Sequence, residues 1–180
     1  MNKLIIASML VFTFISCTNK PKEQTEKSDI FIEQKVSDFV NAHPSWTSGE
    51  NTDEEVTDKF QHEVKRWSNE ENFLDKMPLQ LTELRDTTLN GQVFKIGTFT
   101  GYNDNMRAKG SILNYIQLRI DGFLPPEIEK TIQKDSKYTI TGMLYKQGSR
   151  KDVKVIHVAD FKGYDLGKYL FSITSVHPIK

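Results

Sequence analysis

The stretch Asn114–Tyr145, NYIQLRIDGFLPPEIEKTIQKDSKYTITGMLY, decides the fold expected for this chain. Residues 115–120 alternate between apolar and polar side chains, and a period of two predicts a strand with one buried face. After a turn predicted at Asp121-Gly122, the pair Pro125-Pro126 ends the sheet, because proline donates no ladder hydrogen bond. The pattern therefore predicts a strand followed by a break.

A short helix over residues 126–135 is predicted after that break. Proline suits the first turn of a helix, and Glu127 and Glu129 lie where the helix dipole favours negative charge. Ile128 and Ile132 form a narrow apolar stripe on an otherwise polar segment. We expect this helix to plug one end of a barrel, with a second strand over residues 138–145.

Further strands are predicted on both sides of this unit. Strands are expected over 79–84 and 93–100 before it, separated by a turn over 86–91, and over 153–161 after it. Gly97 indicates a bulge or bend inside the second strand. The tail from Gly163 is predicted to add an edge strand. The main order is three strands, a helix and two strands.

This order, together with the strand Lys137-Tyr138-Thr139-Ile140-Thr141-Gly142, resembles the OB-fold, a five-stranded Greek-key barrel. Its helix lies between strands 3 and 4. More narrowly, the chain resembles OB-type domains of small lipoproteins from Bacteroidota-like bacteria, some grouped as anticodon-binding-domain-like. The resemblance covers roughly residues 77–161 and brings no catalytic motif. The alternative is an open curved sheet packed on helices, as in cystatin-like or nuclear-transport-factor-like domains. Either architecture is α+β.

Residues 1–16 have the pattern of a targeting segment. Lys3 supplies the positive end, and the apolar run Leu4–Ile15 is shorter than the roughly 20 residues that span a bilayer. The following Phe14-Ile15-Ser16-Cys17 resembles the lipobox of bacterial lipoproteins. That resemblance implies lipidation of Cys17 by palmitate-type acyl chains and attachment to a membrane of the cell envelope. The alternative is an ordinary secretory signal peptide with a chance cysteine.

The mature chain is predicted to begin with a tether and a pair of helices. Residues 17–27 are expected to form a flexible tether, because residues 18–27 lack apolar side chains. Residues 28–76 are expected to form a helical hairpin that packs on the barrel of residues 77–180. The second helix is predicted to open with a capping box in Thr52-Asp53-Glu54-Glu55. Cys17 is the only cysteine, so no intramolecular disulfide is available.

The formal charge is zero but is unevenly distributed. Residues 17–76 have six more acidic than basic side chains, and residues 77–180 have five more basic than acidic ones. Acidic helices docking on a basic barrel would explain this difference. The alternative is an anion-binding face on the second and third strands and neighbouring loops. The candidate ligand-binding residues are Lys95, Tyr102, Arg107, Lys109, Tyr115, Gln117, Arg119, Lys146, Arg150 and Lys151.

No catalytic or metal-binding motif emerges. The four histidines lack ligand spacing, and Arg66 stands where a His62-Glu63 metalloprotease motif needs its second histidine, so no metal or cofactor is predicted. We therefore expect a non-enzymatic binding or interaction module whose partner is a glycan, a peptide or an envelope protein. The modest charge and the envelope location argue against nucleic acid. The alternative is a small envelope hydrolase using Asp104, Asp121 and Asp160.

Overall fold

The computed structural model describes residues 28–46, 53–102, 111–158 and 161–179. The leader, Cys17 and the predicted tether lie outside these residues. The predicted α+β class is confirmed. The helices are α1 (Phe31–Ala42), α2 (Glu54–Trp67) and the one-turn α3 (Pro126–Glu129), with 3-10 helices η1 (Ile112–Tyr115) and η2 (Arg150–Asp152). The strands are β1 (Leu79–Leu89), β2 (Gln92–Gly101), β3 (Ile116–Leu124), β4 (Lys137–Gln147), β5 (Lys154–Val158) and β6 (Phe161–Pro178).

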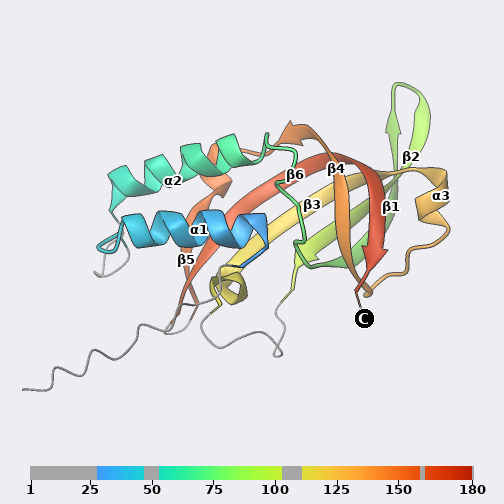
Figure 1. Ribbon diagram of the computed structural model, residues 1–180. Helices are drawn as coiled ribbons and strands as arrows, with labels where there is room; N and C mark the ends of the chain where they lie inside the picture. The colour runs from blue at the N-terminus through green and yellow to red at the C-terminus, as the bar shows by residue number, and fades with distance from the viewer. Residues whose placement is uncertain (1–27, 47–52, 103–110, 159–160, 180) are drawn as a thin grey trace, which may run out of the picture.

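These strands form one sheet that closes in a ring (Figure 1). The strand order is β3-β2-β1-β4-β6-β5, and β3 also pairs in parallel with β6. Strands β1, β2, β3, β6 and β4 thus form the ring, while β5 pairs only with β6 among the described strands. The contact between β1 and β4 is short, with Leu79 opposite Tyr138 and Gln80 opposite Lys137. This closure differs from the open-sheet alternative.

The tail of the chain has a larger role than predicted. Instead of an edge strand, β6 is the longest strand, and it pairs with β3, β4 and β5. This part of β6 lies between β3 and β4, and its alternating residues Tyr169, Phe171 and Ile173 are buried in the main core. The strand predicted over 153–161 is the short edge strand β5. Among the described residues the sheet therefore has six strands and not five.

Three predicted boundaries are also wrong. Residues Asp121 and Gly122 lie inside β3, where Gly122 pairs with Gly97, and they do not form a turn. The predicted 86–91 turn shrinks to Asn90 and Gly91, whose φ angles of 50° and 78° suit a two-residue hairpin. The helix predicted over 126–135 ends at Glu129, and turns follow it.

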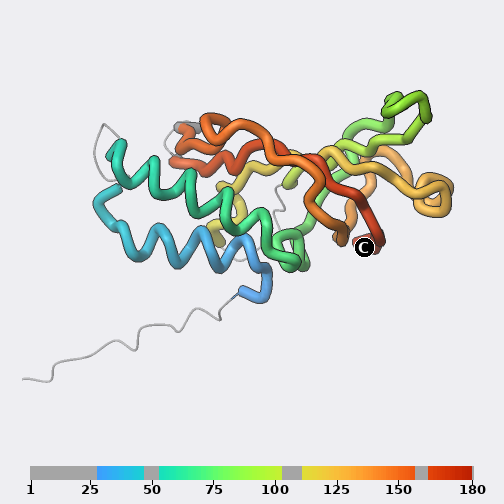
Figure 2. Tube along the Cα trace, turned by 90° about the horizontal axis from the view of Figure 1, so that it is seen from above, coloured from blue at the N-terminus to red at the C-terminus, as the bar shows by residue number. Residues whose placement is uncertain are grey.

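Helices α1 and α2 lie side by side over one end of the sheet (Figures 1 and 2). The rings of Trp46 and Phe60 contact that of Tyr164 on β6, with centroids 5.8 Å and 6.0 Å apart. Asp53, not Thr52, is the N-cap of α2, and its carboxylate accepts a hydrogen bond from the Val56 amide at 3.1 Å. Aromatic packing thus joins the helices and the sheet in one core.

Candidate interaction surface on the outer sheet face

The side chains of strand β3 point alternately to the two faces of the sheet. Ile116, Leu118, Ile120 and Leu124 are buried in the main core. The residues between them point to the opposite side, because side chains alternate along a strand. We call this opposite side the outer face; on β3 it carries Gln117, Arg119, Asp121 and Phe123.

An aromatic row crosses the outer face. The rings of Phe94 on β2 and Phe123 on β3 meet edge to face, with centroids 5.7 Å apart, and Tyr145 on β4 meets Phe123 at 5.4 Å. Met143 and Tyr145 are 70% and 58% exposed. Ile96 lies opposite Phe123 in register and is buried, yet it is not part of the main core. These five residues form the outer apolar patch.

A charged cluster borders this patch. The carboxylate of Asp121 accepts hydrogen bonds from Arg85 Nη2 at 3.0 Å and from Thr98 Oγ1 at 2.8 Å, and Arg119 Nε lies 3.4 Å from it. The side chains of Arg85 and Arg119 are 37% and 38% exposed. Asp121 therefore holds two guanidinium groups in place while leaving part of each accessible. Fixed guanidinium groups can bind carboxylates or phosphates with two parallel hydrogen bonds.

Further cations extend the surface across β4, β5 and β6. Lys168 lies beside Arg119 in the parallel register of β3 and β6, and Lys146 lies opposite Leu170, a neighbour of Asp121. Lys154 on β5 pairs with Asp165. All three lysines are exposed. The described part of the outer face thus has more cationic than anionic side chains.

The predicted ligand-binding residues are only partly brought together. Gln117, Arg119 and Lys146 share the outer face. Lys95 does not, since its ammonium lies 2.7 Å from a carboxylate oxygen of Asp86 and 3.6 Å from one of Glu129. The hydrogen bond and charge of Asp86 raise the pKa of Lys95, although desolvation partly offsets this.

The remaining candidates lie elsewhere. Arg150 forms an ion pair with Asp58 at 3.0 Å and contacts His62, so it faces α2. The ring of Tyr102 lies under the ammonium of Lys137, 4.5 Å from its centroid. Tyr115 packs against the main core, and Lys151 is exposed on η2. Arg107 and Lys109 lie outside the described residues.

The sequence interpretation missed Arg85, Phe94, Phe123 and Tyr145. Phe123 could have been found, because the alternation of residues 115–120 continues to Leu124 once Asp121-Gly122 is not taken as a turn. The other three come from separate strands, and only the pairing of β1, β2 and β4 within the ring places them near it.

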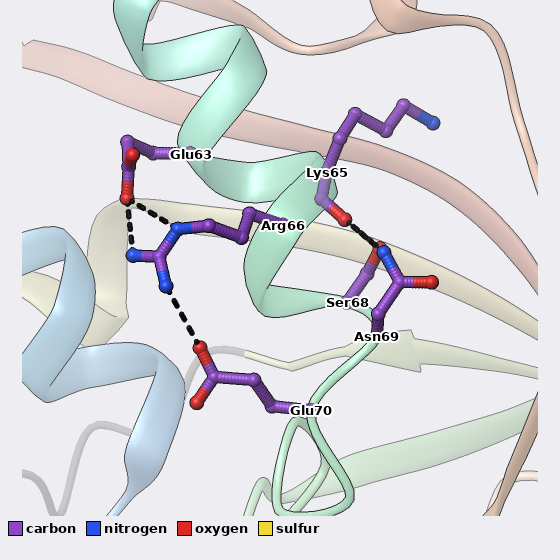
Figure 3. Close-up of polar contacts among 6 residues, drawn as sticks. All are labelled: Glu63, Lys65, Arg66, Ser68, Asn69 and Glu70. Carbon is purple, nitrogen blue, oxygen red and sulfur yellow. Dashed lines mark hydrogen bonds and ion pairs between the residues drawn. The ribbon is translucent and has the colours of Figure 1, made fainter.

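A groove lies between α1 and α2, away from the outer face. This groove has a volume of about 530 Å³ and includes Phe39, Trp67, Lys35 and Arg66 in its lining. Figure 3 shows that the Arg66 guanidinium is bound by Glu63, at 2.5 Å and 3.2 Å, and by Glu70 at 3.4 Å. The hydrogen bond from Arg66 holds the pKa of Glu63 below its usual value. These contacts stabilise the helix region and leave Arg66 less available to a ligand.

The arrangement gives no support to the carboxylate-based hydrolase. Asp121 is held by two guanidinium groups and a threonine, while Asp104 and Asp160 lie outside the described residues. Among the residues described, no cluster of histidine, cysteine, aspartate and glutamate could hold a metal ion.

No protein-family model, no curated protein and no solved structure matches this chain. The function is therefore inferred from the geometry of the outer face and from the residues at the N-terminus.

Proposed function

We propose that this chain is a lipoprotein anchored to a membrane of the cell envelope and acts as a non-enzymatic binding or interaction module. The outer apolar patch beside the cluster of Arg85, Asp121 and Arg119 is the observation that carries this proposal. Tyrosine, phenylalanine, methionine and arginine are enriched at protein interaction surfaces. A partner would cover Met143 and Tyr145, which no described element covers.

An OB-like barrel is the proposed scaffold. Without the edge strand β5, the ring contains β1, β2, β3, β4 and β6, with α3 between the third and fourth strands. OB-folds bind ligands on the face of their second and third strands. The corresponding strands here carry Phe94, Thr98, Arg119 and Phe123, in agreement with this assignment.

The proposed anchor is the acylated Cys17. Its support is the apolar leader that ends in Ser16-Cys17, followed by a polar segment. Within the described ranges, no helix is long and apolar enough to cross a bilayer. A glycan, a peptide or another envelope protein is the proposed class of partner, since exposed aromatic rings can stack on sugars or cover apolar side chains.

Cell fractionation tests the anchor. Wild-type protein should be recovered with membranes, whereas Cys17→Ala should lose this attachment and be released to the soluble envelope fraction. Metabolic labelling with a palmitate analogue should mark the wild type and not the variant. Recovery of both proteins in the same membrane fraction, without labelling, would contradict the anchor.

Cross-linking in cells and panels of immobilised glycans and peptides test the binding role. The variant Met143→Ser/Tyr145→Ser should lose the captured partner, because it removes the exposed part of the outer apolar patch. Val93→Ser is the matched control: Val93 is 71% exposed, but its register opposite Thr88 places it on the other side of the hairpin. Equal capture by both variants would exclude this surface.

A further inference from the structure

The shape of the outer face limits the kind of partner that suits it. Small ligands bind mainly in concave sites. The groove between α1 and α2 and a second hollow of about 620 Å³, which includes Ile132, Tyr138 and Val176, both lie away from the outer face. The apolar patch lies instead on the outside of the sheet, spread over three strands. An apolar patch spread over three strands suits a partner with an extended surface.

The charge of the outer face selects an anionic partner. Five cations surround the apolar patch or extend from it: Arg85, Arg119, Lys146, Lys154 and Lys168. The carboxylates among them are Glu83, Asp121 and Asp165. Each carboxylate already has a partner on this face: Glu83 lies 4.0 Å from Arg85, Asp121 is bound by two arginines, and Asp165 accepts a hydrogen bond from the Gly167 amide at 2.9 Å. The exposed lysines thus dominate the field outside the sheet.

The helices have the opposite charge and lie on the opposite side of the sheet. Residues 17–76 have an acidic excess of six. Exposed carboxylates on or next to the helices include Asp38, Glu54, Glu55 and Asp58. An anionic surface would therefore attract the outer face and repel the helices, which fixes one orientation of the domain.

We infer that the outer face lies against the anionic phospholipid surface of the membrane in which the chain is anchored. This inference rests on the proposed function, because acylation of Cys17 would hold the domain close to that surface and raise its effective concentration there. Lysines contact anionic headgroups, and the tyrosine at the patch suits the interface between headgroups and acyl chains. One acyl anchor combined with a basic surface binds more firmly than either alone.

Vesicle sedimentation tests the inference without the anchor. The protein used is residues 18–180, which retains every described residue and lacks Cys17. It should sediment with vesicles made from three parts phosphatidylethanolamine and one part phosphatidylglycerol, but not with phosphatidylcholine vesicles. Raising the salt from about 0.05 M to 0.5 M should release it, because screening weakens exposed charges.

A charge reversal identifies the surface. Lys146→Glu/Lys168→Glu should weaken binding to the anionic vesicles by about 25-fold or more, since each lysine near the surface contributes roughly fivefold. Lys130→Glu/Lys134→Glu makes the same change in net charge at two exposed positions beyond the outer face, and should weaken binding by less than about threefold. Equal losses in the two variants would overturn the inference.

An environment-sensitive fluorophore reports the orientation. Because residues 18–180 contain no cysteine, Met143→Cys and Asp38→Cys can each be labelled at a single position. The label at 143 should shift to the blue on anionic vesicles, whereas the label at 38 should not. Equal shifts, or no sedimentation at all, would contradict membrane docking. Capture of a glycan or an envelope protein through the same face without vesicle binding would assign the surface to that partner.

The anchor and the docking surface can fail separately. Fractionation of Cys17→Ala tests only the lipid anchor. Vesicle binding of residues 18–180 tests only the outer face, because this protein lacks Cys17. If Cys17→Ala stays with the membranes as the wild type does, but residues 18–180 bind anionic vesicles, the protein is a peripheral membrane protein without an acyl anchor. The reverse result would leave an anchored domain that does not lie against its membrane.

Discussion

Gly122 of β3 lies against Ile173 of β6 on the inside of the ring, so closely that a β-carbon at residue 122 would be 2.5 Å from Ile173 Cγ1. Gly122 pairs with Gly97 of β2, where a β-carbon would be 2.9 Å from Phe99 Cε2. The two glycines leave room for Ile173 and Phe99 where β3 pairs with both neighbours. The close approach of β3 and β6 is what closes the ring.

Gly122→Ala should therefore destabilise the fold. Real β-carbons essentially never approach another atom as closely as 2.5 Å, so the strands or Ile173 must move. Overpacking of this kind typically costs about 1–3 kcal/mol. The free energy of unfolding, measured by urea denaturation, should fall by that amount.

Gly101→Ala is the matched control for this prediction. A β-carbon at residue 101 would lie 3.4 Å from the flexible end of Met77, which is an ordinary contact, so its effect should be within about 0.5 kcal/mol. In the double variant Gly122→Ala/Ile173→Ala, part of the cost of the alanine at 122 should disappear. Additive losses would show that the contact between these two residues does not constrain the ring.

The sequence predicts those parts of the fold that local periodicity specifies. The alternating side chains of β3 and β4 predicted both strands and their buried faces, and the proline pair predicted where α3 begins. The role of β6 was missed because its partners are distant in sequence, and because pairing irregularities next to Gly142 and Lys146 of β4 interrupt a simple period. Strand partners depend on the whole ring and not on one segment.

The candidate surface was predictable to a smaller degree. The sequence identified Arg119, Gln117 and Lys146, because each lies in or next to a strand whose alternating pattern puts it on the side away from the core. Phe94, Phe123 and Tyr145 are far apart in sequence, and only the closed sheet brings their rings together. Lys95 was misplaced because its polar strand position gave no sign of the carboxylates of Asp86 and Glu129 that engage it.

Asp121→Asn should lower the free energy of unfolding, because it weakens the hydrogen bonds that Asp121 accepts from Arg85 and Arg119. The amide cannot balance the charges of Arg85 and Arg119, and we expect a loss of about 1–2 kcal/mol in the free energy of unfolding. Glu83→Gln is the control, because Glu83 lies 4.0 Å from Arg85 and is 54% exposed. It should cost less than about 0.5 kcal/mol. Equal effects in urea denaturation would argue against a specific role for Asp121.

Tyr169 should make the protein sensitive to alkaline pH. Its side chain is almost fully buried, and its hydroxyl donates a hydrogen bond to the Leu166 carbonyl at 2.7 Å. Burial raises the pKa of Tyr169 above its usual value near 10. The pKa of Tyr169 is therefore higher in the folded than in the unfolded protein. The contribution of its neutral hydroxyl to the free energy of unfolding is fully present below pH 10 and is lost as the pH rises further. The loss should approach about 1.4 kcal/mol for each pH unit.

Tyr169→Phe separates this titration from others. The variant should lose about 1 kcal/mol at neutral pH, since a buried hydrogen bond is removed, and its stability should fall less steeply above pH 10. Tyr145→Phe, at an exposed tyrosine, removes a hydroxyl outside the main core and should leave the stability at neutral pH unchanged. Identical slopes in the wild type and Tyr169→Phe would contradict the prediction.

Phe73 and Phe94 should differ sharply in their contribution to stability, although both are aromatic. Phe73, between α2 and β1, is 1% exposed, and its ring lies 5.2 Å from Tyr169 and 6.3 Å from Phe171. Phe73→Ala should cost about 3–5 kcal/mol, as for other large-to-small changes in a core. Phe94 lies on the outer face, is only half-buried and meets Phe123 there, so Phe94→Ala should cost about 1 kcal/mol.

Urea denaturation of both variants, with near-ultraviolet circular dichroism as a second probe, checks this contrast. A loss at Phe94 as large as that at Phe73 would mean that the outer apolar patch is a second core, and its role as an interaction surface would have to be abandoned. A small loss leaves Phe94→Ala folded at normal temperature. Any binding defect of that variant can then be attributed to the surface itself, because the main core around Phe73 is unchanged.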